Sequence, residues 1–125
     1  MARRWGDPVR LITETELLFP RTAVAIALLE TGGFQARSMM KSHNWFGFRK
    51  NGRGFQKRIR KGYGEYASAQ MMLADYQAWE TDVCLRYGIK NEEQFRRWIC
   101  RHYAADPDYP TKLAINLAEV NKTWQ

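Results

Sequence analysis

The sequence predicts an α+β domain that is predominantly helical and carries one small β-hairpin. Apolar residues recur at helical spacing over most of the chain, whereas residues 46–66 consist of short alternating pieces separated by glycines. Strands and helices do not alternate in the way that would indicate a parallel βαβ arrangement. A chain of 125 residues fits one core, so we expect a single domain over residues 1–125.

Two helices are expected in the N-terminal part of the chain. The first covers residues 8–18, with Asp7 as its N-cap and a proline at the first helical position. The second starts at Pro20 and ends at Glu30, directly before a threonine and two glycines. The connection that follows can contain one helical turn around residues 39–40.

Three further helices are expected in the C-terminal half. Ser68 caps a long helix that Gly88 closes. Residues 91–93 begin the next helix with acids in its first turn, and residues 106–107 end it. Pro110 starts the last one.

The segment between these two groups of helices is strongly basic. Asn51 and the glycine after it form a tight-turn signal, which predicts the hairpin. Residues 49–61 contain seven basic side chains and no acid, within a chain of net charge +7. Such a segment is suited to polyanions, which include nucleic acid, a membrane surface and an anionic cell wall, but it can also be a plain solvated loop.

Several classes of protein and site are not expected. No run of about 18 apolar residues indicates a membrane span. Charged residues between positions 7 and 16 interrupt any apolar stretch that could follow Arg3 and Arg4, so we expect no signal peptide in this chain. The two cysteines and two histidines lack metal-ligand spacing, and we expect neither a metal nor another cofactor.

The first candidate for chemistry is Glu30. It follows an apolar helical run, and both the negative end of the helix dipole and desolvation raise the pKa of a carboxyl there. A carboxylic acid that stays protonated near neutral pH can protonate a departing sugar oxygen. The alternative is an ordinary solvated residue at a helix end.

A second candidate segment combines an amide with aromatic rings. Asn44, Trp45 and Phe46 stand within six residues that also include Phe48. Aromatic faces stack on sugar rings, and an amide both donates and accepts hydrogen bonds, so we expect these three to bind substrate. The alternative is that the rings only anchor a loop to the core.

Three motifs in order carry a resemblance to a known family. They are AIALLETG at residues 25–32, HNWFG at residues 43–47 and YAADPDY at residues 103–109. The sequence resembles the glucosaminidase domain, glycoside hydrolase family 73, which includes flagellar peptidoglycan hydrolases and bacterial autolysins. The resemblance implies a lysozyme-like fold with a small β-hairpin lobe, and cleavage of the β-1,4 bond that follows N-acetylglucosamine in peptidoglycan.

The resemblance makes Glu30 the general acid but leaves the second catalytic group open. The family has a proposed second glutamate on the hairpin, whereas residues 49–64 of this chain contain no acid. Glu65 is the nearest candidate and can activate water as a base. Alternatively, the N-acetyl group of the substrate attacks the anomeric carbon, or the site is inactive and the protein only binds glycan.

Three tyrosines complete the expected site. Tyr103 corresponds to the tyrosine of the family motif, which implies a hydrogen bond to the N-acetyl group or to the reacting water, although Ala105 replaces the usual threonine. Tyr66 and Tyr109 are candidates for the cleft walls. For all three, the alternative is a core tyrosine with a satisfied hydroxyl.

We therefore expect a bacteriolytic peptidoglycan hydrolase that acts on the bacterial cell wall, in the periplasm, outside the cell or as part of a virion. Without a signal peptide, delivery would depend on a phage particle, a secretion apparatus, lysis or a longer parent protein. A noncatalytic glycan-binding component of a phage tail or secretion assembly is the first alternative. A nucleic-acid-binding domain ranks below both, because no nucleic-acid motif accompanies the basic segment.

Overall fold

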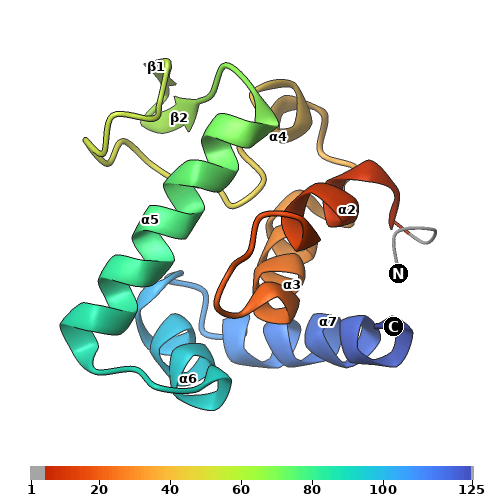
Figure 1. Ribbon diagram of the computed structural model, residues 1–125. Helices are drawn as coiled ribbons and strands as arrows, with labels where there is room; N and C mark the ends of the chain where they lie inside the picture. The colour runs from red at the N-terminus through yellow and green to blue at the C-terminus, as the bar shows by residue number, and fades with distance from the viewer. Residues whose placement is uncertain (1–4, 125) are drawn as a thin grey trace.

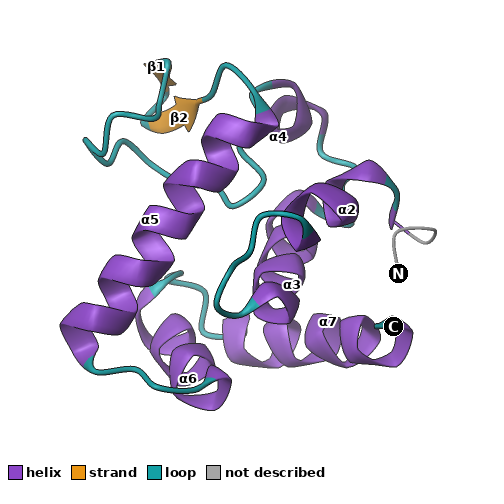
Figure 2. Ribbon diagram, viewed as in Figure 1, coloured by secondary structure: helices purple, strands orange, loops and turns teal. Residues whose placement is uncertain are grey.

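The computed structural model describes residues 5–124, which fold into helices with one small hairpin at one end of the molecule (Figures 1 and 2). The helices of this part of the chain are α2 (Asp7–Thr13), α3 (Pro20–Thr31), α4 (Arg37–Lys41), α5 (Ala69–Tyr87), α6 (Glu92–His102) and α7 (Tyr109–Thr123). The strands β1 (Arg58–Arg60) and β2 (Tyr63–Glu65) pair antiparallel. The predicted fold class, α+β and predominantly helical, is confirmed.

Helix α3 is the centre of the fold. Its side chains from Thr22 to Leu28 are all buried, and its main neighbour is α7. The long helix α5 connects two ends of the molecule: the hairpin lies near its N-terminal end and α6 near its C-terminal end (Figure 1). The C-terminal turn of α3, where Glu30 lies, is therefore attached to a rigid core element.

Aromatic rings fasten the segment after α4 to the core. Phe46 is fully buried and stacks on Tyr76 of α5, with ring centroids 4.2 Å apart. Phe48 meets the edge of Trp79 at 5.6 Å. Trp79 in turn contacts Tyr103 at 5.5 Å, so rings from three distant parts of the chain share one cluster.

The prediction for the first helix is wrong at both ends. Gly6 precedes the first helical residue, so Asp7 lies inside α2 and not at the N-cap. The helix stops at Thr13, and Glu16 has a left-handed φ of 58°. Buried Glu80 of α5 accepts hydrogen bonds from the backbone N–H groups of residues 18 and 19, at 2.7 and 3.2 Å, which holds them outside a helix.

The hairpin is present, but its turn is not at Asn51. The two strands are joined by Lys61 and Gly62, both with positive φ (52° and 86°), which is the backbone of a tight two-residue turn. The side chain of Asn51 is used elsewhere, because it donates to Asp75 and accepts from the backbone N–H of Arg53.

The remaining helices agree with the sequence prediction. The expected turn around residues 39–40 is α4, and the second helix extends one residue past Glu30, to Thr31. α5 starts where it was expected, and α7 starts at Tyr109, one residue before the predicted Pro110. α6 ends at His102, before the predicted stop at residues 106–107. No helix within residues 5–124 has the length and hydropathy that crossing a bilayer requires.

Candidate active site

Glu30 lies in the last turn of α3 and is half-buried. Burial raises the pKa of its carboxyl above the usual value, and the nearby Tyr109 hydroxyl acts in the opposite direction. The helix ends one residue later, at Thr31, because Gly32 adopts the left-handed C-cap conformation. The carboxyl is therefore held at a fixed helix end in the partly desolvated setting that favours its protonated form.

Tyr109 is the first residue of α7 and its side chain is almost fully buried. No hydrogen bond of good geometry joins its hydroxyl to another described residue, Glu30 included. The two groups are nevertheless close enough to affect one another, because the charge of Glu30 adds to burial in raising the pKa of Tyr109. The tyrosine thus stays protonated, with its hydroxyl near the Glu30 carboxyl.

The backbone of Gly47 passes directly over the same carboxyl. A Cβ placed on Gly47 would lie 2.8 Å from Oε1 of Glu30, and the residue has a φ of +68°. Only glycine meets both conditions without strain. The hydroxyl of Tyr103 donates a hydrogen bond to the carbonyl oxygen of Phe46, the residue before Gly47. The structure therefore brings Glu30, Gly47, Tyr103 and Tyr109 together from three separate segments.

Asn44, predicted to bind substrate, uses both of its amide protons in hydrogen bonds within the protein. Its Nδ2 donates to the carbonyl oxygens of Phe48 and Gly64, both at 2.9 Å. Its Oδ1 accepts from the N–H of Phe48, also at 2.9 Å, and the side chain is buried. In this structure Asn44 fastens the HNWFG segment to the hairpin, which is a positioning role.

The predicted sugar-stacking rings also lie in the core. Trp45 packs edge-on against Phe34, with ring centroids 5.9 Å apart. Phe46 has no exposed surface, and Tyr66 donates its hydroxyl proton to Asp75. These rings are buried, as is the ring of Tyr109, so they anchor their segments to the core, and their contact with substrate stays a prediction.

Glu65 lies on β2 and is occupied by two ion pairs. Its carboxylate oxygens are 3.4 Å from Nε of Arg58 and 3.1 Å from Nε of Arg60. The side chain is only one-fifth exposed. The carboxylate of Glu65 thus pairs with arginines of the hairpin. The neighbours of the Glu30 carboxyl are instead Gly47 and Tyr109.

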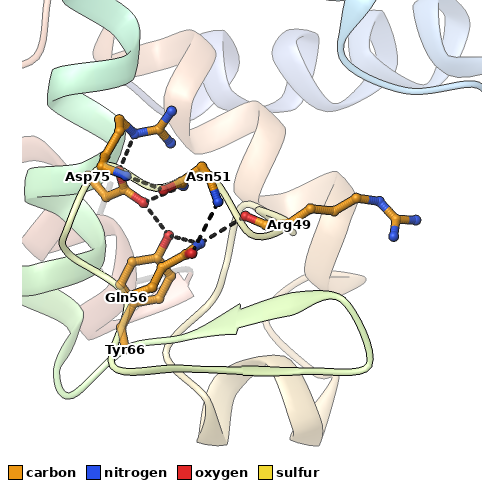
Figure 3. A network of polar contacts seen from close by, with 6 residues as sticks. Arg49, Asn51, Gln56, Tyr66 and Asp75 are labelled. Atoms are coloured by element: carbon orange, nitrogen blue, oxygen red, sulfur yellow. Dashed lines mark hydrogen bonds and ion pairs between the residues drawn. The ribbon is translucent and has the colours of Figure 1, made fainter.

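A polar network that the sequence did not reveal fixes the long loop before the hairpin (Figure 3). Asp75 of α5 is fully buried and accepts hydrogen bonds from Asn51 (2.8 Å), Arg53 and Tyr66. Gln56 extends the network, since its Nε2 donates to the Tyr66 hydroxyl and to a backbone carbonyl of the loop. The available signal was an acid within the apolar stripe of a long helix, which requires buried partners.

Two hollows in the described surface lie away from Glu30. One is a groove between α6 and α7, and the other lies on the outer side of α5 around Phe55. Neither is lined by Glu30, Tyr103 or Gly47. We therefore assign the candidate active site to the surface at the end of α3 and not to these hollows.

Comparison with known families places nearly the whole described chain in one family. The sequence model of the Glucosaminidase family, described as mannosyl-glycoprotein endo-beta-N-acetylglucosaminidase, matches residues 8–122. The chain belongs to this family. No curated protein and no solved structure gives a significant match. Membership supports a glycoside hydrolase that acts on peptidoglycan, and the fold is consistent with a lysozyme-like glucosaminidase domain.

Replacing Gly47 with alanine tests the contact with the Glu30 carboxyl. We expect Gly47→Ala to lower peptidoglycan hydrolysis by about tenfold to a hundredfold, because the new Cβ displaces the Glu30 carboxyl from its position. Gly88→Ala is the matched control: Gly88 also has positive φ, but no atom lies within 4 Å of its added Cβ. Both variants should lose about 1 kcal/mol of stability through backbone strain. Equal hydrolysis by the two variants would contradict the contact.

Proposed function

We propose that this protein is an endo-β-N-acetylglucosaminidase that cleaves the β-1,4 bond after N-acetylglucosamine in peptidoglycan, with Glu30 as the general acid. The observation that carries the proposal is the half-buried Glu30 carboxyl, with its raised pKa, beneath Gly47 of the HNWFG segment. A glycosidase requires such a protonated acid beside the bond that breaks.

In this proposal Glu30 gives its proton to the leaving glycosidic oxygen. Proton transfer by a positioned acid contributes roughly a hundredfold to ten-thousandfold to the rate. The Tyr109 hydroxyl limits how far the pKa of Glu30 rises, since it stabilises the carboxylate that remains after transfer. Glu30 can then take a proton from water in the second half of the reaction.

Substrate assistance supplies the second group in our proposal. The two arginines that hold the Glu65 carboxylate compete with any water that it would activate. The carbonyl oxygen of the substrate N-acetyl group instead attacks the anomeric carbon while the bond to the leaving oxygen breaks. Water then attacks the same carbon, reopens the oxazoline and gives its proton to Glu30.

Tyr103 acts through the backbone in this scheme and not on the substrate. Its hydroxyl proton is used in the hydrogen bond to Phe46, which holds the peptide next to Gly47. We therefore assign Tyr103 as a positioning residue that keeps Gly47 against the acid. Tyr103→Phe should reduce kcat while leaving the pH at which activity falls unchanged.

The anomeric form of the product separates the two mechanisms. Two successive displacements at one carbon return the original configuration, so proton NMR of a fresh digest should show the β-anomer first. We expect Glu65→Gln to retain hydrolysis within about tenfold of the wild type, because no proton transfer depends on it. First appearance of the α-anomer, with a loss above about a hundredfold in Glu65→Gln, would instead establish Glu65 as the base.

Digestion of purified peptidoglycan tests the proposed function itself. New reducing ends that consist of N-acetylglucosamine support it, whereas muramic acid ends would indicate a lysozyme. Binding to insoluble wall without any release would indicate a noncatalytic component of a larger assembly.

A further inference from the structure

The positive charge of this chain is concentrated in one lobe. Residues 49–65, here called the hairpin lobe, contain seven basic side chains and a single acid, Glu65. They account for a net +6 of the chain's net +7. The remaining surface is therefore close to neutral, so the charge marks one region and is not a general feature of the surface.

Three arginines gather on one face of this lobe. In the antiparallel register Arg58 pairs with Glu65 and Arg60 pairs with Tyr63, so all four side chains share a face of the hairpin. Arg49 joins them through a bridge to Tyr63 and places its guanidinium 4.6 Å from the centre of that ring. We call Arg49, Arg58 and Arg60 the guanidinium face.

The guanidinium face has an excess of unneutralised charge. Glu65 is the one carboxylate paired with it among the described residues, and it serves both Arg58 and Arg60. The side chains of these two arginines are 54% and 65% exposed. Arg53, by contrast, points to the buried carboxylate of Asp75. One partly exposed carboxylate thus pairs with two of the three guanidinium groups, and no ion pair to Arg49 is found among the described residues.

The lobe behind this face is fixed by contacts. Gln56 packs so closely over Gly64 that its side chain leaves no room for a Cβ there. The Asp75 network ties the preceding loop to α5. Holding the guanidinium groups on an attached lobe lowers the entropy that binding a partner costs.

We infer that the guanidinium face binds the repeated oxyanions of the bacterial cell wall polymer, outside the catalytic centre. Guanidinium forks match carboxylate and phosphate oxygens in pairs. Tyr63, 44% exposed and in contact with Arg49, adds an aromatic ring that can contact the sugar backbone. This inference rests on the proposed function for the choice of a wall polymer over other polyanions.

Two wall anions share the required chemistry: carboxylates of the peptide substituents and phosphodiesters of attached polymers. A nucleic acid also carries phosphodiesters. A face of three arginines on a two-stranded hairpin covers a few anions, whereas sustained nucleic-acid binding uses a longer stripe of contacts. The wall polymer is therefore the partner that we propose for this face.

Cosedimentation with purified insoluble wall tests the inference. All proteins carry Glu30→Gln, so that binding is measured without cleavage. The test variant adds Arg58→Gln and Arg60→Gln. The control adds Arg86→Gln and Arg97→Gln, which remove two equally exposed arginines from helices α5 and α6. Melting curves confirm that both variants fold.

We expect the test variant to bind the wall about fivefold more weakly than its parent at low salt, and the control within twofold. The difference should fade at 0.5 M NaCl because exposed charges are screened. Wall treated with hydrofluoric acid, which removes phosphodiester polymers, identifies the anion: retained binding indicates carboxylates and lost binding indicates phosphodiesters.

Equal weakening by the control would overturn the inference, since net charge alone would then explain it. Preference for DNA or RNA over wall, lost with the same two arginines, would also overturn it in favour of nucleic acid. Because binding is measured separately from hydrolysis, a wild-type protein that binds through this face but releases no sugar would contradict only the proposed function.

Discussion

Replacing Glu30 with glutamine is expected to lower peptidoglycan hydrolysis by about a thousandfold or more. Glutamine has the same size and can accept a hydrogen bond from Tyr109, but it has no proton to give to the leaving oxygen. The release of reducing ends from purified peptidoglycan measures the loss. Glu93→Gln is the matched control, because Glu93 is an exposed acid in a surface ion pair on α6. Hydrolysis by Glu30→Gln at the level of this control would exclude Glu30 as the acid.

The same substitution should leave the fold intact or stabilise it. Burial raises the pKa of Glu30 in the folded state above its unfolded value of about 4.5. Stability from such a group is present below the unfolded pKa and is lost as pH rises through the folded pKa. Glutamine does not ionise, so the melting temperature of Glu30→Gln relative to wild type should increase between pH 4 and pH 7. A fall across that range would contradict the raised pKa.

Local signals explain why most helices could be predicted from the sequence. Ser68 accepts a hydrogen bond from the N–H of Met71 at 3.2 Å, and Gly88 takes the left-handed conformation, so both ends of α5 are set by neighbouring residues. The conformation of residues 18 and 19, where the first helix was expected to end, could not be found in this way. It depends on Glu80, which lies more than sixty residues along the chain from the backbone groups that it binds.

In the candidate site, too, local sequence identifies one residue, whereas its neighbours depend on contacts between distant segments. Glu30 could be selected because its sequence position, after a buried helical run, determines its environment. Its partners could be named only as motif residues, since the contact with Gly47 and the proximity of Tyr109 exist only after α3, α7 and the HNWFG segment have packed together. The rings of Trp45 and Phe46 show the limit of the argument from residue type, because a ring that suits a sugar suits a core equally well.

Replacing Asp75 with alanine is expected to lower the free energy of unfolding by about 3 kcal/mol. The buried carboxylate accepts from Asn51, Arg53 and Tyr66, and its removal leaves a partly buried guanidinium and a buried hydroxyl without their acceptor. The stabilising free energy that is lost is larger than for a surface ion pair, because the Asp75 network lies in a region of low dielectric constant. Urea denaturation, followed by tryptophan fluorescence, measures it.

Asp82→Ala is the matched control on the same helix. Asp82 is 60% exposed and pairs with Arg86 at 3.4 Å, so its loss should change stability by less than about 0.5 kcal/mol. The loss of unfolding free energy in Asp75→Asn should lie between the losses in these two variants. Its amide oxygen still accepts a hydrogen bond from Tyr66, but the negative charge opposite Arg53 is gone. A stability for Asp75→Ala equal to that of Asp82→Ala would mean that the loop of residues 49–57 does not depend on this network. The loop carries the hairpin with its guanidinium face, whereas Glu30 lies on α3. At a temperature where Asp75→Ala remains folded, the substitution should therefore weaken wall binding more than it lowers the hydrolysis of short glycan fragments.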